Sequence, residues 1–340
     1  MIRLAQIGVG YWGKNILRNF ASLDGVELAW VCDSREQVQE TVKERYRTVQ
    51  TTGNVEDIWS DDSVDAVVVA INAASHASLA SQALAAGKHV FVEKPLTLDV
   101  RDGEKLVAQA RAADRILMVG HLLKYHPAYL WMKEQIDAGA LGDVRYLYST
   151  RVNLGRVRTD ENALWSLAPH DFSVMLMLLG EEPARVSATG HAYLQSDIED
   201  VVFVTVSFPS GRIGHIHVSW LDPHKVRQLT VVGTKKMAVL DDVSATEKVR
   251  IFDHGVDTTT TQGQAPYGSY AEALTYRQGD ISIPAIAMTE PLRKECAAFV
   301  EAISTGNPPP SDGADGLAVV KLLAAAQESL EHQGRPVELT

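Results

Sequence analysis

Three glycines near the start of the chain have the spacing G-x-G-x-x-G, in Gly8-Val9-Gly10-Tyr11-Trp12-Gly13. The motif follows an apolar run with strand character and opens a helical pattern, which is the context in which such glycines bind a dinucleotide. Glycines let the backbone approach a pyrophosphate closely, and the N-terminus of the following helix attracts its charge. The turn therefore predicts a dinucleotide site that includes Tyr11 and Trp12.

An acidic residue, Asp33, ends the next strand pattern, 20 residues after Gly13. A carboxylate at this place accepts hydrogen bonds from the adenosine ribose hydroxyls and repels the 2′-phosphate of NADP. Ser34 and Arg35 lie beside it, and the Arg35 guanidinium either stacks on the adenine or pairs with that phosphate. On balance the sequence favours NAD over NADP.

The elements that must position these residues follow from the apolar runs of the first part of the chain. Five runs predict buried parallel strands, at residues 2–7, 27–32, 66–71, 89–92 and 116–119. Helical patterns lie between them, at residues 13–22, 35–46, 77–86 and 100–113. This alternation predicts an α/β Rossmann domain over residues 1–121, whose doubly wound parallel sheet binds ligands at the carboxyl ends of its strands.

The pattern changes near residue 120, and residues 122–340 predict an α+β domain for substrate binding and oligomerisation. Helices at 127–138 and 166–179 flank a long strand at 144–153. Further strand patterns follow without helices between them, at 185–194, 201–208, 212–220, 227–232, 236–240 and 248–252. They predict a large, mostly antiparallel open sheet. Its second face needs a partner, so we expect a homodimer or a homotetramer.

The end of the chain carries weaker patterns. Residues 253–289 show little periodicity, which suggests an arm or a loop over the site. Two helices, at 291–304 and 315–330, follow. The last of them, residues 315–330, is a candidate to pack back on the N-terminal domain.

The composition limits the partners that the protein can have. A length of 340 residues fits two domains. The 32 Lys and Arg against 43 Asp and Glu give a formal charge of −11, which disfavours nucleic acid and anionic membranes as partners. The apolar runs are too short to span a membrane, and the N-terminus leaves no room for a signal peptide. Two cysteines, Cys32 and Cys296, form no disulfide framework or thiolate metal cluster, so we expect a cytoplasmic protein without a metal.

A second motif, Glu93-Lys94-Pro95, follows the strand at 89–92, at the sheet edge where a nicotinamide is expected. On this motif within residues 86–96, on His76, and on the segments 119–127, 168–171 and 311–316, the chain resembles the glucose–fructose oxidoreductase and inositol dehydrogenase family (Gfo/Idh/MocA). The resemblance extends over essentially the whole chain. It implies hydride transfer between a hydroxyl-bearing carbon and a nicotinamide.

The resemblance also implies roles for single residues. Lys94 corresponds to the family's lysine near the reacting hydroxyl, and His170 to a histidine that commonly acts as acid or base. The residue types suit these roles, because an ammonium stabilises developing alkoxide charge and an imidazole exchanges a proton near neutral pH. Without the resemblance, a histidine in a helix rich in Leu and Met would be read as a packed structural residue. Asn72, His76 and Glu93 complete the expected cofactor site.

One position departs from the family's pattern. Many members carry an Asp one helical turn before this histidine, where it assists the base, but here that residue is Ser166. A hydroxyl orients an imidazolium less strongly than a carboxylate does, so the proton path is expected to differ. Asp171 adjoins His170 but points to another face of the helix, so only an indirect role is expected for it.

Weaker candidates for substrate contact come from segments expected to flank the cleft: Tyr125, Arg151, Asn153 and Trp165. Aromatic and amide side chains suit sugar faces and hydroxyls, and an arginine suits a phosphate or a carboxylate. Packing is the alternative for each. Arg156 and Arg158 add positive charge, although a solvated loop is the simpler explanation. His215 and His217 share one strand face, as in some metal sites, but nothing nearby completes a set of ligands.

The expected substrate is a sugar or another polyhydroxylated ring. The helix motif Ala-Pro-His-Asp at 168–171, the turn at 220–223 and the strand at 231–236 resemble nucleotide-sugar 3-dehydrogenases, which oxidise the C3 hydroxyl of a UDP-N-acetylhexosamine or its uronate. Inositol or glycoside dehydrogenases and 3-ketosugar reductases remain alternatives within the family. A noncatalytic NAD-binding regulator is the alternative from another class, and the presence of Lys94 and His170 argues against it.

Overall fold

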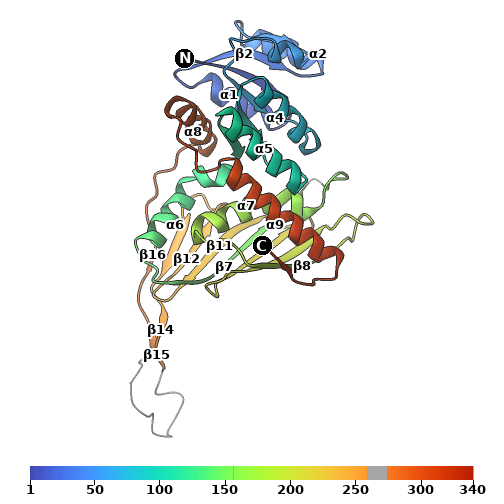
Figure 1. The fold of residues 1–340 in the computed structure, drawn as a ribbon. Helices are drawn as coiled ribbons and strands as arrows, with labels where there is room; N and C mark the ends of the chain where they lie inside the picture. Colours follow the sequence, from blue (N-terminus) through green and yellow to red (C-terminus); the bar gives the residue numbers. More distant parts are fainter. Residues whose placement is uncertain (156, 259–273, 340) are drawn as a thin grey trace. The chain divides into compact units, whose positions relative to one another are not determined.

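The computed structural model describes residues 1–155, 157–258 and 274–339. The chain forms two compact units, one of Met1–His126 with Thr289–Ala324 and one of Pro127–Met288 with Ala325–Thr340. The first unit therefore consists of two segments, one that runs to His126 and one from near the end of the chain. Figure 1 shows the elements of each unit in sequence colours.

The first unit contains a six-stranded parallel sheet in the order β3-β2-β1-β4-β5-β6. Its strands are β1 (Ile2–Ile7), β2 (Val26–Cys32), β3 (Gln50–Thr52), β4 (Ala66–Val69), β5 (His89–Glu93) and β6 (Leu117–Gly120). This order is that of a dinucleotide-binding Rossmann sheet, which confirms the predicted fold class. No sequence pattern predicts β3, because this short strand, Gln-Thr-Thr, has no apolar run.

Both faces of this sheet are buried, which explains the continuous apolar runs. The helices that follow the strands are α1 (Gly13–Ala21), α2 (Glu36–Arg45), α3 (Glu56–Trp59), α4 (His76–Ala85) and α5 (Val100–Ala113), with the short 3-10 helices η1 (Ala73–Ser75) and η2 (Leu122–Tyr125). Alternate residues of one strand belong to two different clusters. In β4, Val67 and Val69 pack with Ala80 of α4, and Val68 packs with Phe20 of α1.

Two elements from the end of the chain complete the first unit, α8 (Pro291–Thr305) and the first part of α9 (Gly313–Glu331). Helix α8 begins with a proline and ends at Gly306, whose φ of 74° suits a glycine cap. Its Phe299 lies edge-on to Phe20 and Phe91, with ring centroids 6.2 and 5.8 Å apart. Because all three rings are fully buried, α8 is part of the core of this unit.

The second unit contains a nine-stranded sheet in the order β16-β13-β12-β11-β7-β10-β9-β8-β17. Its strands are β7 (Val144–Val152), β8 (Arg185–His191), β9 (Val201–Ser207), β10 (Ile213–Ser219), β11 (Val226–Gly233), β12 (Met237–Asp241), β13 (Val249–Phe252), β16 (Ile281–Ser282) and β17 (Val337–Glu338). All neighbours are antiparallel except β7 and β10. The predicted large, mostly antiparallel sheet is confirmed.

Helices α6 (Pro127–Asp137) and α7 (Ala163–Leu179) lie on one face of this sheet (Figure 1). Several large side chains of this sheet are exposed, with exposed fractions of 41–47%: Tyr146, Tyr148, Phe203 and Ile213. In β7 the exposed Tyr148 alternates with the buried Leu147 and Ser149, so the two faces differ in exposure. We expect a second copy of the chain to cover this exposed face of the sheet.

A two-stranded sheet, β14 (Gly255–Thr258) and β15 (Leu274–Arg277), occupies part of the segment expected to form an arm. Residues 259–273 of that segment lie outside the described residues. None of the helices in the described ranges combines the length and the apolar character needed to cross a membrane.

Replacing Phe299 by alanine should lower the free energy of unfolding of the first unit by about 3–5 kcal/mol, because it leaves a cavity between two buried rings. Urea unfolding followed by circular dichroism measures the loss. Leu98→Ala is the control, since Leu98 is 46% exposed and its loss should change stability by no more than about 0.5 kcal/mol. Equal effects of the two substitutions would contradict the place of α8 in this core.

Candidate active site

The glycine-rich turn between β1 and α1 is shaped by close contacts of its backbone. Gly8 has a φ of 91°, and a Cβ there would lie 2.4 Å from the carbonyl oxygen of Ala70. A Cβ on Gly13 would lie 2.5 Å from the carbonyl oxygen of Gly8. Gly10 differs, because a Cβ there would meet nothing within 4 Å. The outer glycines thus form the turn, and the middle one leaves space in which a pyrophosphate fits.

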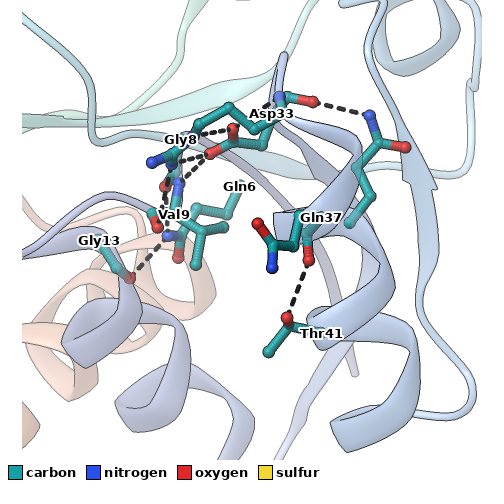
Figure 2. Close-up of polar contacts among 9 residues, drawn as sticks. Gln6, Gly8, Val9, Gly13, Asp33, Gln37 and Thr41 are labelled. Atoms are coloured by element: carbon teal, nitrogen blue, oxygen red, sulfur yellow. Dashed lines mark hydrogen bonds and ion pairs between the residues drawn. The ribbon is translucent and has the colours of Figure 1, made fainter.

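The side chain of Gln6 in β1 holds this turn through two hydrogen bonds. Its Nε2 donates to the carbonyl oxygens of Gly8 and Gly13, each at 2.8 Å, and its side chain is fully buried (Figure 2). No sequence pattern singled out this residue. The available signal was an amide among the apolar residues of the second half of β1, since a buried polar group needs a partner.

Asp33 lies directly after β2, and its carboxylate is bonded to the turn and to its own neighbour. Its Oδ2 accepts the backbone N–H of Val9 at 2.9 Å (Figure 2). The Arg35 guanidinium donates to both carboxylate oxygens, each at 2.8 Å. Burial alone would raise the pKa of Asp33, but the bonds from Arg35 and the backbone outweigh it and hold that pKa below its usual value. The carboxylate is thus ionised, as an acceptor for ribose hydroxyls must be.

Arg35 is itself exposed, as is Ser34. The bidentate pair with Asp33 occupies the guanidinium without burying it. An exposed arginine can turn away when a ribose approaches Asp33. With the open space at Gly10 and the ionised Asp33, the residues of this edge fit NAD.

The Glu-Lys-Pro segment begins at the end of β5. Glu93 is the last residue of the strand, and its Oε1 accepts the indole N–H of Trp12 at 2.8 Å. Its Oε2 accepts the backbone N–H of Lys94 at 3.2 Å. Burial raises the pKa of Glu93 to about 7, against the lowering effect of the charge on Lys94. The turn and the predicted reactive lysine are therefore linked through one carboxyl group.

His76 begins α4, and Asn72 precedes η1, both after β4. His76 is buried, with Nδ1 2.7 Å from the carbonyl oxygen of Pro95. Burial lowers its pKa, so the ring is neutral and Nδ1 is the donor. This bond holds the residue after Lys94 in place. Direct contact of Asn72 or His76 with a cofactor stays a prediction.

The carboxyl end of β6 is lined by buried polar residues. Among the described residues, neither ring nitrogen of the buried His121 has a hydrogen-bond partner, and burial lowers the pKa of that ring to about 3. Lys124 forms an ion pair with Asp315 of α9. The Tyr125 hydroxyl lies 2.9 Å from Ser311 Oγ, and its ring is buried in the core. This geometry favours packing over the substrate contact predicted for Tyr125.

In the second unit, His170 lies half-buried on α7, one turn after the buried Ser166. The start of the helix is capped by Asn162, whose side chain accepts the backbone N–H of Trp165 at 3.1 Å. The cap is fixed in turn, because its amide donates to Glu199 and Gln327 at 2.6 and 2.9 Å. The helix that carries His170 is therefore firmly anchored at its N-terminus.

Arg151, near the end of β7, is buried and forms a bidentate ion pair with Asp171. Its Nε and Nη2 donate to the two carboxylate oxygens at 2.6 and 3.2 Å. The charge of Asp171 more than offsets burial and raises the pKa of Arg151 above its usual value. Because its charge is matched inside the protein, this geometry favours packing over the substrate contact predicted for Arg151, which stays a prediction. It fixes α7 on the sheet beside His170.

The remaining candidates stand at the surface or partly buried. Asn153 directly follows β7, and Trp165 is half-buried on α7, so substrate contact by either stays a prediction. Arg158 pairs with Glu161 at 2.9 Å, as expected of a solvated loop. Arg156 lies outside the described residues.

The two strand histidines have aromatic and hydroxyl neighbours. His215 Nδ1 lies 3.1 Å from Thr205 Oγ1, and the His217 ring stacks on Phe203 with centroids 4.3 Å apart. Within the described part of the chain, no group of three or more metal-ligating side chains is found.

Two family models match the chain. One, described as "Oxidoreductase family, NAD-binding Rossmann fold", matches residues 2–121, and the other, "GFO/IDH/MocA C-terminal domain", matches residues 129–239. Together they cover the Rossmann sheet and the helices and central strands of the second unit.

Relatives of known name span nearly the whole chain. Myo-inositol 2-dehydrogenase of Thermotoga maritima is 27% identical, covering 99% of this chain and 98% of the relative. UDP-N-acetylglucosamine 3-dehydrogenase of Acidithiobacillus ferrooxidans is 26% identical, with 96% and 95% covered. Its structure has a TM-score of 0.80 over 97% of this chain and 98% of that one. GenD2 from gentamicin A biosynthesis, solved in complex with NAD, is 27% identical with a TM-score of 0.81, covering 100% and 96%.

The two matching models and these full-length relatives agree with the glycine turn, the ionised Asp33 and the Glu-Lys-Pro segment. The chain belongs to the GFO/IDH/MocA family of NAD-binding oxidoreductases and is a nicotinamide-dependent dehydrogenase.

Proposed function

We propose that this dehydrogenase oxidises a secondary hydroxyl of a sugar, namely the C3 hydroxyl of a UDP-N-acetylhexosamine or a related sugar. The observation that carries the proposal is the similarity, over both units, to the UDP-N-acetylglucosamine 3-dehydrogenase of Acidithiobacillus ferrooxidans. The sequence Ala-Pro-His-Asp at 168–171 supports it, because it resembles the corresponding segment of nucleotide-sugar 3-dehydrogenases.

In this proposal, Lys94 and His170 handle the proton of the reacting hydroxyl. Bound NAD⁺ supplies the hydride acceptor. The Lys94 ammonium holds the hydroxyl oxygen and stabilises the negative charge that develops on it. The His170 imidazole takes the proton as that charge develops, and it returns the proton in the reverse direction. Arg151 and Asp171 act indirectly, by holding α7 against β7.

An inositol is the second candidate substrate. It is favoured by the myo-inositol 2-dehydrogenase of Thermotoga maritima, whose identity of 27% and coverage of 99% are at least as high as those of the sugar-nucleotide enzyme. The two candidates share the chemistry at the reacting carbon. They differ in the anionic nucleotide, which an inositol lacks.

The substrates can be separated by following NADH formation from NAD⁺ with UDP-N-acetylglucosamine, its uronate and myo-inositol. We expect NADH with a UDP-sugar and none with inositol. A single-turnover phase has to be recorded beside the steady state, because an unfavourable equilibrium hides slow net turnover. NADH formed with inositol alone would overturn the nucleotide-sugar assignment, and tight NADH binding with no turnover of any of the three would favour a regulator.

His170→Ala should lower turnover by about 10²–10⁴-fold, the usual contribution of a general acid or base. NADH affinity, measured by fluorescence titration, should stay as it was, because in this proposal His170 acts on the proton of the substrate while the glycine turn and Asp33 hold the dinucleotide. His332→Ala is the matched control, since His332 is an exposed histidine just after α9. If His170→Ala turns over as fast as the unchanged protein, His170 has no part in the reaction.

The unchanged protein should bind NADH much more tightly than NADPH, because the ionised Asp33 repels a 2′-phosphate. Asp33→Asn should bring the ratio of the NADPH and NADH dissociation constants closer to one, since an amide carries no charge to repel the 2′-phosphate. Titration of both dinucleotides by fluorescence measures this ratio. Equal affinities in the unchanged protein would mean that Arg35, not Asp33, governs the choice of cofactor.

A further inference from the structure

One side chain of the glycine-rich turn reaches the end of another strand. The Trp12 indole donates its Nε1–H to Glu93 Oε1 at 2.8 Å, although the two residues are 81 positions apart in sequence. Trp12 is 37% exposed, so burial in a core does not fix its ring. It also makes no side-chain hydrogen bond to cap α1. The bond to Glu93 is therefore what orients this indole.

Glu93 has a second donor on its other oxygen, the backbone N–H of Lys94 at 3.2 Å. The space for the carboxyl group comes from Gly120, the register partner of Glu93 in β6. A Cβ on Gly120 would lie 3.0 Å from Glu93 Oε1 and 3.3 Å from Oε2. The carboxyl group thus lies against the backbone of β6 and joins two donors, one from the turn and one from Lys94.

Glu93 differs in its hydrogen bonds from a second carboxyl group with which it interacts electrostatically, that of Glu295. Glu295 of α8 is fully buried, and among the described residues neither of its carboxyl oxygens has a hydrogen-bond partner. Burial, with a smaller effect from Glu93, raises the pKa of Glu295 well above its usual range, so Glu295 is neutral. Burial raises the pKa of Glu93 to about 7, and the charge of Lys94 and the bonds from Lys94 and Trp12 work against that rise. Hydrogen bonds to an ionised acceptor are about twice as strong as neutral ones.

We propose that Glu93 is a positioning residue through which the glycine-rich turn controls Lys94. When a dinucleotide occupies the turn, the Trp12 indole is held against Glu93, and Glu93 in turn fixes the segment that carries the Lys94 ammonium. A bound dinucleotide thereby stabilises the arrangement of the Lys94 segment that these two hydrogen bonds already define. This inference rests on the proposed function, in which Lys94 holds the reacting hydroxyl.

ADP-ribose provides a direct test, because it fills the adenosine and pyrophosphate part of the site and carries no nicotinamide to shield Lys94. The rate at which trinitrobenzenesulfonate labels Lys94 is measured by peptide mass spectrometry, with and without saturating ADP-ribose. We expect ADP-ribose to slow labelling by about tenfold, the effect of one hydrogen bond to a charged group. In Trp12→Phe, which keeps an aromatic ring and loses only the donor, the slowing should disappear.

Trp30→Phe is the matched control, because the Trp30 indole also donates to a carboxylate at 2.8 Å, that of Asp61. This variant should respond to ADP-ribose like the unchanged protein. Glu93→Gln should lose the response, and adding Trp12→Phe to it should cause no further change, since both substitutions break the same link.

Calorimetric titration with ADP-ribose shows whether each variant is folded and saturated. The proposal is overturned if ADP-ribose does not slow the labelling of Lys94 in the protein without substitutions. It is also overturned if ADP-ribose slows this labelling as much in Trp12→Phe as in Trp30→Phe. The assay contains no sugar, so a wrong assignment of the substrate does not alter its outcome.

Discussion

The close approach of the first turn to the end of β4 is the constraint on which the cofactor site depends. Gly8 has no room for a side chain against Ala70, and Gly13 has none against Gly8. These contacts bring the N-terminus of α1 to the carboxyl edge of the sheet, where its unpaired N–H groups can face a pyrophosphate. Gln6 donates to the carbonyl oxygens of Gly8 and Gly13 and so joins the two ends of the tight turn. These bonds offset part of the cost of burying its amide, whose Oε1 has no hydrogen-bond partner among the described residues.

Buried charges in both units are matched by partners inside the same unit. Lys124 pairs with Asp315 in the first unit, and Arg151 pairs with Asp171 in the second. An unpaired charge in either place would be strongly destabilising, so each pair fixes the elements that carry it. Lys124 ties η2 to α9, and Arg151 ties β7 to α7. Both pairs therefore place the ends of strands and helices from which reactive side chains project.

The sequence predicted the elements of the fold in which apolar residues form clear runs or recur at a regular spacing. The apolar runs predicted β1, β4 and β5 nearly to the residue, because strands buried on both faces are mostly apolar. It could not give β3, which has no such run. Nor could it assign α8 to the first unit, because the contact of Phe299 with Phe20 and Phe91 joins residues far apart in the chain. Long-range packing of this kind leaves no local pattern.

The residues of the candidate site divide in the same way, into those with local roles, which were predicted, and those with partners elsewhere in the chain, which were not. Gly8, Gly13 and Asp33 were found because their roles depend on local backbone geometry at fixed spacing. Gln6 was missed, and Tyr125 and Arg151 were predicted as substrate contacts with packing as the alternative, because residue type alone does not reveal an internal partner. Ser311 and Asp171 are those partners, and they lie 186 and 20 positions away in sequence.

The ion pair between Asp171 and Arg151 matters for His170, because the position one helical turn before that histidine holds Ser166 and not an aspartate. In a helix, a carboxylate one turn before His170 would stabilise its protonated form, and here that position holds a hydroxyl. Asp171 is the adjacent carboxylate, but both of its oxygens accept bonds from Arg151, so its charge is already matched. Asp171 therefore does not take the place of that carboxylate, because its charge is bound to Arg151 and holds α7 on β7. Any effect of Asp171 on His170 is indirect, through the position of the helix that carries both residues.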